Sequence, residues 1–389
     1  MSRALWLWGL AGLAAIALLI FFRGDAAASD DSAGCAPTET FVPAFCVNVP
    51  TSSVRRETTV PLVSLPSEHA DVRVEMTVPG TDAAALSVGV DRAVERVETL
   101  FGRPFSVRPR VLVFGTASSF GQGAQELFGY SRATADDVAR SYGGIFDRPT
   151  LTIAINWSAA SSGRMSAAIA HELTHLMVRD MTHGAAVPTW LDEGLAAFIE
   201  QESPGGAIFL GDEELSGRAL AASGAVALED VTALRDWHAA YARFDRPLYA
   251  YAANAVRAMR ARVGWRRIVA VLDDVSRGTR FDAAYFAESG ETVSGLQRRL
   301  GSQSGPAIAA TTPDASGSVR YTVFSAAANA LVEITITSAS GYRLSFTART
   351  NGSGMYRGTF GATAAPGLYT VTAAGATATF VTTRWRVRS

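Results

Sequence analysis

A short run of residues, H-E-L-T-H at positions 171–175, constrains what this 389-residue chain can fold into more than any other feature. Residues four positions apart on an α-helix lie on the same face, so His171 and His175 can reach one metal ion. Glu172 lies beside the first histidine and can reach a water molecule on that ion without binding the ion itself. The pattern therefore predicts a helix, placed at residues 162–181, that carries part of a zinc site.

A second run, W-L-D-E-G-L-A at residues 190–196, supplies a third ligand. Glu193 lies 18 positions after His175, and the short intervening loop lets a second helix fold back toward the first. Two imidazoles and one carboxylate leave a zinc position open for water, whose pKa the metal lowers. Glu172 can then take the proton of that water as it attacks a carbonyl. We therefore predict one Zn²⁺ per chain, bound by His171, His175 and Glu193, with Glu172 as the general base.

The two runs together resemble the motifs of the gluzincin zinc metallopeptidases, the clan of thermolysin and the zinc aminopeptidases, and most of all the peptidase MA-like family. The resemblance covers roughly residues 85–300. It implies a peptide or protein substrate and a thermolysin-like α+β fold, in which a small mixed sheet and an active-site helix are followed by a helical lobe. It also implies that the strand before that helix, at residues 151–157, lines the cleft and can pair with an extended peptide.

The resemblance further implies a tyrosine of the helical lobe that donates a hydrogen bond to the developing oxyanion. Tyr249 and Tyr251 are the candidates, and the small residues that follow favour Tyr251 as the catalytic residue. The alternative is that Tyr251 is an aromatic core residue. The G-x-M-E-N strand with which aminopeptidases read a free amino terminus is absent, and Y-G-G-I at residues 142–145 does not replace it. This difference favours an endopeptidase over an aminopeptidase.

Hydrophobic periodicity places further secondary structure along the chain. We expect strands at residues 72–78 and 110–114 and helices at 82–101, 190–202, 248–263, 265–276 and 281–300. Thr189 and Asp192 fit a capping box at the start of the helix that carries Glu193. Residues 115–145 match no pattern well enough to be assigned.

The N-terminus carries an uncharged run, residues 4–22, bounded by Arg3 and Arg23. The run is longer than the usual apolar region of a signal peptide, about 7–15 residues, and approaches the ~20 residues that span a bilayer. Small residues at 26–28 nevertheless offer a cleavage site, so an uncleaved transmembrane anchor and a cleaved signal both stay open. We expect a single-pass cell-membrane protein with an extracytoplasmic catalytic domain, or a secreted protein if the segment is cleaved.

Cys35 and Cys46 are the only cysteines, and they lie close together just beyond this run. In an oxidising compartment such a pair can form a small disulfide loop, the alternative being two free thiols. The formal net charge of −1 gives no electrostatic footprint for nucleic acid, which excludes that class of partner.

The C-terminal part changes character after a linker rich in Pro, Ala, Thr, Ser and Gly. Val332, Ile334 and Ile336 alternate with polar residues, and similar short alternating segments predict a small immunoglobulin-like β-sandwich. Residues 319–389 contain no histidine and no cysteine, so no metal chemistry is expected there. The expected core of this sandwich consists of Tyr321, Val323, Val332, Ile334, Ile336, Phe346, Tyr369 and Val371.

These observations divide the chain into five parts. They are a transmembrane anchor or signal peptide (1–23), an irregular stalk (24–60), a gluzincin-like peptidase domain (61–304), a linker (305–318) and a β-sandwich (319–389). A second hypothesis is a zinc-retaining, non-catalytic surface protein that binds partners through its C-terminal β domain. Glu172 separates the two hypotheses, because a structural zinc site needs no general base and is normally closed by four ligands.

Overall fold

The computed structural model describes a defined set of residues. They are 40–42, 45–47, 56–159, 165–203, 210–244, 246–302, 307–310, 318–324, 329–338, 340–351, 354–360 and 367–382. The predicted N-terminal anchor or signal, together with Cys35 of the predicted disulfide, lies outside them. Two short strands, β1 (Thr40–Val42) and β2 (Phe45–Val47), form an antiparallel pair near the start of the described chain.

The predicted single-pass membrane localisation is corrected by the helices of the structure. Across the part of the chain that the structure describes, no helix combines the length and the apolar character needed to cross a bilayer. The run at residues 4–22, on which the prediction rested, is outside that part.

A five-stranded mixed sheet with the order β3-β4-β5-β7-β6 forms the first half of the fold. Its strands are β3 (Leu62–Leu65), β4 (Asp71–Glu75), β5 (Arg110–Phe114), β6 (Gly144–Asp147) and β7 (Thr152–Asn156). β4, β5 and β7 are parallel, whereas β3 and β6 join antiparallel at the two edges. The two central strands, β5 and β7, are buried along their whole length, as expected for parallel strands covered on both faces.

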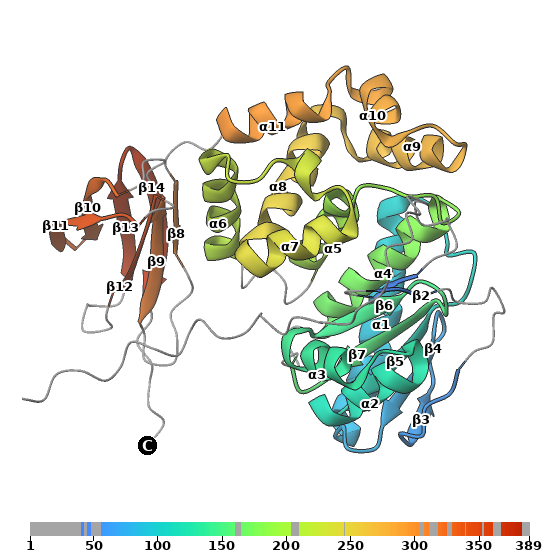
Figure 1. The fold of residues 1–389 in the computed structure, drawn as a ribbon. Helices are drawn as coiled ribbons and strands as arrows, with labels where there is room; N and C mark the ends of the chain where they lie inside the picture. Colours follow the sequence, from blue (N-terminus) through green and yellow to red (C-terminus); the bar gives the residue numbers. More distant parts are fainter. Residues whose placement is uncertain are drawn as a thin grey trace, which may run out of the picture. The chain divides into compact units, whose positions relative to one another are not determined.

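Helices cover both faces of this sheet (Figure 1). Val111 and Val113 of β5 face a core shared with α1 (Gly80–Phe101) and α4 (Met165–Met181). Leu112 and Phe114 of the same strand face the opposite core, which is shared with α2 (Ala117–Phe128) and α3 (Arg132–Ser141). The alternation along β5 thus produces three layers, and α4, which carries residues 171–175, belongs to the first core.

The second half is a helical lobe that shares its core with α1, α4 and one face of the sheet. Its helices are α5 (Thr189–Glu202), α6 (Leu210–Ser223), a 3₁₀ turn (Leu228–Val231), α7 (Leu234–Phe244), α8 (Arg246–Val263), α9 (Trp265–Ser276), α10 (Phe281–Ser289) and α11 (Val293–Ser302). α8 packs very closely on α5: a Cβ added to Gly194 would lie 2.7 Å from the carbonyl oxygen of Ala252.

Three local predictions need correction. A strand, β7, does form within residues 151–157, but it lies between β5 and β6, so the edge available to a peptide belongs to β6. α5 begins with Pro188 as its N-cap and no side-chain cap, so Thr189 is already inside the helix and the capping box is wrong. The helix predicted at 281–300 is two helices, because Gly290 adopts a left-handed conformation with φ 65°.

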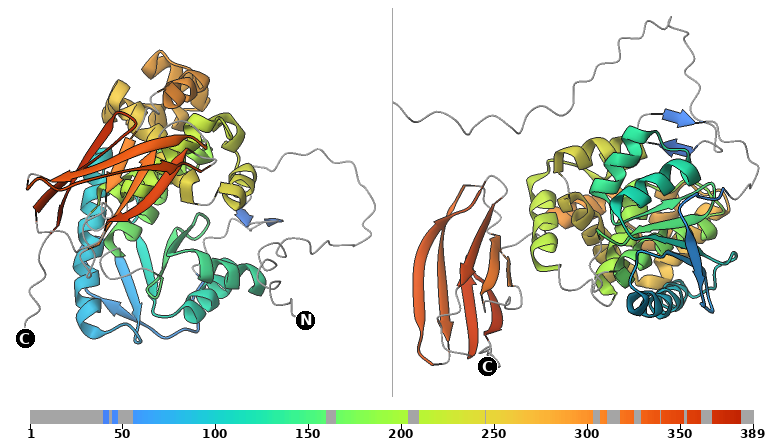
Figure 2. Two further views of the ribbon diagram at one scale, coloured as in Figure 1. Left: turned by 90° about the vertical axis from the view of Figure 1, so that its left-hand side faces the viewer. Right: turned by 90° about the horizontal axis from the view of Figure 1, so that it is seen from below.

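The C-terminal part consists of two antiparallel sheets (Figure 2). Their strands are β8 (Ala307–Ala310), β9 (Val319–Phe324), β10 (Leu331–Ser338), β11 (Arg343–Arg349), β12 (Met355–Phe360), β13 (Gly367–Ala373) and β14 (Ala376–Thr382). The sheets share one core that contains the predicted residues, with Phe346 only partly buried against it. β8 pairs with β9, so part of the predicted linker is strand. The immunoglobulin-like character of this part stays a prediction.

The close approach of α5 and α8 predicts an asymmetric response to alanine at two helical glycines. Gly194→Ala places a methyl group against the carbonyl of Ala252, a backbone atom that cannot rotate away, and should lower the free energy of unfolding by about 1–3 kcal/mol. Gly89→Ala, inside α1, has open space around the new Cβ and should raise it by up to ~1 kcal/mol. Urea unfolding of both variants measures the difference. Equal effects would show that the α5–α8 contact is not tight.

Candidate metal centre

Three side chains from α4 and α5 converge on one point. The Nε2 atoms of His171 and His175 lie 3.3 Å apart, because the four-residue spacing puts both rings on one face of α4. Glu193 Oε2 lies 3.7 Å from Nε2 of His171 and 3.6 Å from Nε2 of His175. Among the residues that the structure describes, this is the one group of three or more His, Cys, Asp or Glu side chains that could hold a metal ion.

The spacing of these atoms fits zinc. Zinc binds imidazole nitrogen and carboxylate oxygen at about 2.0–2.2 Å, so at tetrahedral angles two ligand atoms lie about 3.3–3.6 Å apart. The three observed separations fall close to that range. Two imidazoles and one carboxylate also form a donor set that suits zinc and leaves one tetrahedral position open. The three sequence-predicted ligands therefore lie together in a geometry that fits the ion.

A carboxylate lies beside the outer nitrogen of each histidine. Glu200 Oε2 is 3.1 Å from Nδ1 of His171, and Asp192 Oδ1 is 3.0 Å from Nδ1 of His175. If each Nδ1 carries its proton toward the carboxylate, each Nε2 keeps a lone pair for the metal. Glu200 was not predicted from the sequence, although its position seven residues after Glu193, about two helical turns, puts both on the same face of α5.

The side chains of the site are buried or partly buried, and their charges influence one another. Burial opposes the charge on His171, but the neighbouring carboxylates of Glu193 and Glu200 outweigh it and raise the pKa of His171 well above its usual value. Burial raises the pKa of Glu172, with the two histidines acting in the opposite direction. Burial also disfavours the charge on Asp192, but His175 and a nearby arginine outweigh it and lower its pKa to about 2.

Glu172 is placed apart from the three converging atoms, on the side of α4 that faces the sheet edge. It is 7% exposed, and a Cβ added to Gly144 of β6 would lie 2.9 Å from its Oε1. The absence of a side chain at Gly144 therefore leaves room for the carboxylate beside the edge strand. This position matches a group that reaches a metal-bound molecule without joining the ligands.

The structure separates the two candidate tyrosines. The hydroxyl of Tyr251 donates to Oε1 of Gln297 and lies 3.4 Å from the carbonyl of Val226, so it points into the helical lobe. The ring of Tyr249 instead lies 6.2 Å from the ring of His171. Burial, followed by the charge of Glu193, raises the pKa of Tyr249 well above its usual value and keeps its proton on the hydroxyl. The structure therefore directs the hydroxyl of Tyr251, the predicted catalytic residue, toward Gln297, whereas the ring of Tyr249 lies beside His171.

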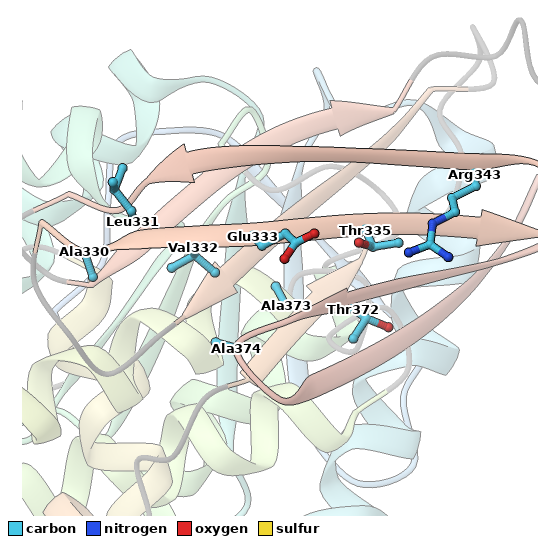
Figure 3. Close-up of a pocket in the computed structure, with 9 residues that line it drawn as sticks. All are labelled: Ala330, Leu331, Val332, Glu333, Thr335, Arg343, Thr372, Ala373 and Ala374. Atoms are coloured by element: carbon cyan, nitrogen blue, oxygen red, sulfur yellow. The ribbon is translucent and has the colours of Figure 1, made fainter.

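A shallow hollow on the C-terminal sheet is a separate feature (Figure 3). It is lined by residues of β10, β11 and β13 and of the turn after β13, including Glu333, Thr335, Arg343 and Thr372. The lining contains one carboxylate, one guanidinium and no imidazole or thiol, so it offers no metal-ligand set. We assign no chemistry to it.

Part of the chain that includes the metal centre matches a known family model. Residues 136–303, which include α4, α5 and α8, match the model described as the Peptidase MA superfamily. This match agrees with the resemblance that the two motifs carry. The match supports a hydrolase of the metallopeptidase type, with zinc as the general cofactor of that superfamily, and does not separate endopeptidases from aminopeptidases.

Two further comparisons add less. The structure of native yeast LTA4 hydrolase matches with 14% sequence identity and a TM-score of 0.39, covering 62% of this chain and 38% of that one. The chain thus spans well under half the length of that protein. No curated protein matches the sequence significantly.

Proposed function

We propose that this protein is a zinc-dependent peptidase in which His171, His175 and Glu193 bind the metal and Glu172 is the general base. The observation that supports this most strongly is the separation of roles in space. Three ligand atoms converge within 4.8 Å of one another, while the Glu172 carboxylate stays outside that group and faces Gly144 of β6. A structural site would need a fourth protein ligand, and among the described residues no further His, Cys, Asp or Glu joins the group.

Zinc, when bound here, would polarise the scissile carbonyl and lower the pKa of a water molecule. Glu172 then accepts the proton of the attacking water and can pass it to the leaving amine. A carboxylate whose pKa is raised by burial is a stronger proton acceptor than one in water, which suits this role. Glu172 is thus proposed as the base of a metallopeptidase reaction.

The substrate is proposed to be an extended peptide or protein segment that pairs with β6. Within the described residues β6 pairs with β7 alone, so its outer side can accept an added strand. The single acid on β6, Asp147, is buried and accepts hydrogen bonds from Thr150 through Oδ2. It therefore offers no carboxylate to a free amino terminus, which supports endopeptidase activity.

Tyr249 is proposed to stabilise the oxyanion. Its ring contacts His171 and is held in place by Trp237 and Tyr241, whose ring centroids lie 5.3 and 5.5 Å away. A hydroxyl that stays protonated can donate to the negative oxygen that develops during hydrolysis.

Replacing the base should separate metal binding from catalysis. Glu172→Gln should lower peptide hydrolysis by about 10²–10⁴-fold, because the amide cannot accept a proton, yet should keep one zinc per chain. A mixed peptide library analysed by mass spectrometry, with and without a zinc chelator, measures the first effect, and elemental analysis measures the second. Glu202→Gln, an exposed position on the same helix as Glu193, is the control and should change neither. Loss of zinc in Glu172→Gln would show that Glu172 is a ligand.

The two tyrosines form a matched pair for the oxyanion role. Tyr249→Phe should lower kcat by about 10²–10³-fold with KM little changed, since only the hydrogen bond to the transition state is lost. Tyr251→Phe should leave kcat near the wild-type value, because its hydroxyl points to Gln297. Steady-state kinetics on a peptide found in the library screen distinguishes them. An equal loss in both variants, or a loss in Tyr251→Phe alone, would contradict the assignment.

A further inference from the structure

Arg148 connects the turn between β6 and β7 to the metal centre. Its Nη2 lies 2.5 Å from Oδ2 of Asp192, in the first turn of α5. The Asp192 side chain is only 4% exposed, whereas that of Arg148 is 60% exposed. The guanidinium therefore reaches from the surface to a carboxylate that is otherwise enclosed by protein.

The turn that carries Arg148 is fixed from two sides. Asp147 accepts hydrogen bonds from the backbone N–H and the hydroxyl of Thr150, at 3.0 and 2.6 Å, which closes the turn on itself. The carbonyl of Arg148 accepts a hydrogen bond of 2.9 Å from Nε of Arg179. Arg179 lies four residues after His175 on α4, so the turn is tied to the same helix that carries the histidines.

The two oxygens of Asp192 face different partners. Oδ1 lies 3.0 Å from Nδ1 of His175, and Oδ2 faces the guanidinium of Arg148. A buried carboxylate is stable only when it is paired and hydrogen-bonded, and Arg148 is its second charged partner beside His175. With that partner removed, Asp192 can turn toward solvent and would no longer fix the imidazole of His175.

We propose that Arg148 is a positioning residue for the metal centre, which holds the Asp192 carboxylate against His175 and thereby sets the direction of its Nε2. The inference rests on the proposed zinc site. Arg148 also links the proposed metal ligands to the turn at the end of β6, the strand with which the substrate is proposed to pair. One guanidinium therefore holds the metal centre and the substrate strand in a fixed relation.

The test measures zinc affinity of the full-length chain by competition with a chromogenic chelator, with no substrate present. Arg148→Ala should weaken zinc binding by about 10–100-fold, the usual effect of losing a group that orients a ligand. Arg148→Lys keeps the charge and should recover part of the affinity, but not all, since a lysine cannot reproduce the planar fork. Arg140→Ala, an exposed arginine paired with Asp137 on α3, is the control and should bind zinc like the wild type.

A double-mutant comparison shows whether Arg148 acts through Asp192. Asp192→Asn should weaken zinc binding by itself, and adding Arg148→Ala to it should cause little further loss. The visible spectrum of the cobalt(II)-loaded protein should change in Arg148→Ala and return toward the wild-type spectrum in Arg148→Lys. Circular dichroism and thermal unfolding of the metal-free variants identify any that fail to fold.

The outcomes separate this inference from the proposed function. Wild-type affinity in Arg148→Ala, or losses that add fully in the double variant, would overturn the positioning role while leaving the zinc site intact. A wild-type protein that binds no zinc would instead overturn the proposed function. Should Arg148→Ala not fold, a wild-type affinity and cobalt spectrum in Arg148→Gln would overturn the inference equally well.

Discussion

The close contact of α5 with both α4 and α8 is the constraint on which the rest of the site depends. Against α4, it puts Glu193 beside the two Nε2 atoms at separations that fit zinc. Against α8, it needs a residue without a side chain at Gly194, next to that ligand. α8 in turn brings Tyr249 to His171. The packing of α5 against these two helices therefore fixes the proposed ligand Glu193 and the proposed oxyanion donor together.

Electrostatics give an independent reason to expect a cation at this point. Glu172, Asp192, Glu193 and Glu200 surround two imidazoles, and the first two of these carboxylates are buried. Such a concentration of carboxylates is costly unless positive charge offsets it. Arg148 supplies one positive group at the surface side of Asp192, and a divalent ion between His171, His175 and Glu193 would supply the rest. The same arrangement explains why each histidine has a carboxylate at Nδ1.

The proposed ligands could be predicted from the sequence because helical periodicity alone puts His171 and His175 on one face, and the second motif points to Glu193 as the third. The oxyanion tyrosine could not be predicted from the sequence, because Tyr249 and Tyr251 are two positions apart on one helix and point in different directions. Only the packing of α8 decides which of the two faces the proposed metal site. The edge strand was missed for a similar reason: β6 is a short, glycine-containing strand with no clear alternation. Arg148 belongs to a turn, and no local pattern links it to Asp192.

X-ray absorption spectroscopy of the zinc-loaded protein tests the central claim most directly, because it reports the atoms around the metal whatever the substrate. The account predicts a four-coordinate zinc with two imidazole nitrogens and two oxygens, one from Glu193 and one from water, all at about 2.0–2.2 Å. The multiple-scattering signal of imidazole should fall by half in His175→Ala. A sulfur ligand at about 2.3 Å, or an imidazole signal that is unchanged in that variant, would contradict the proposed metal centre.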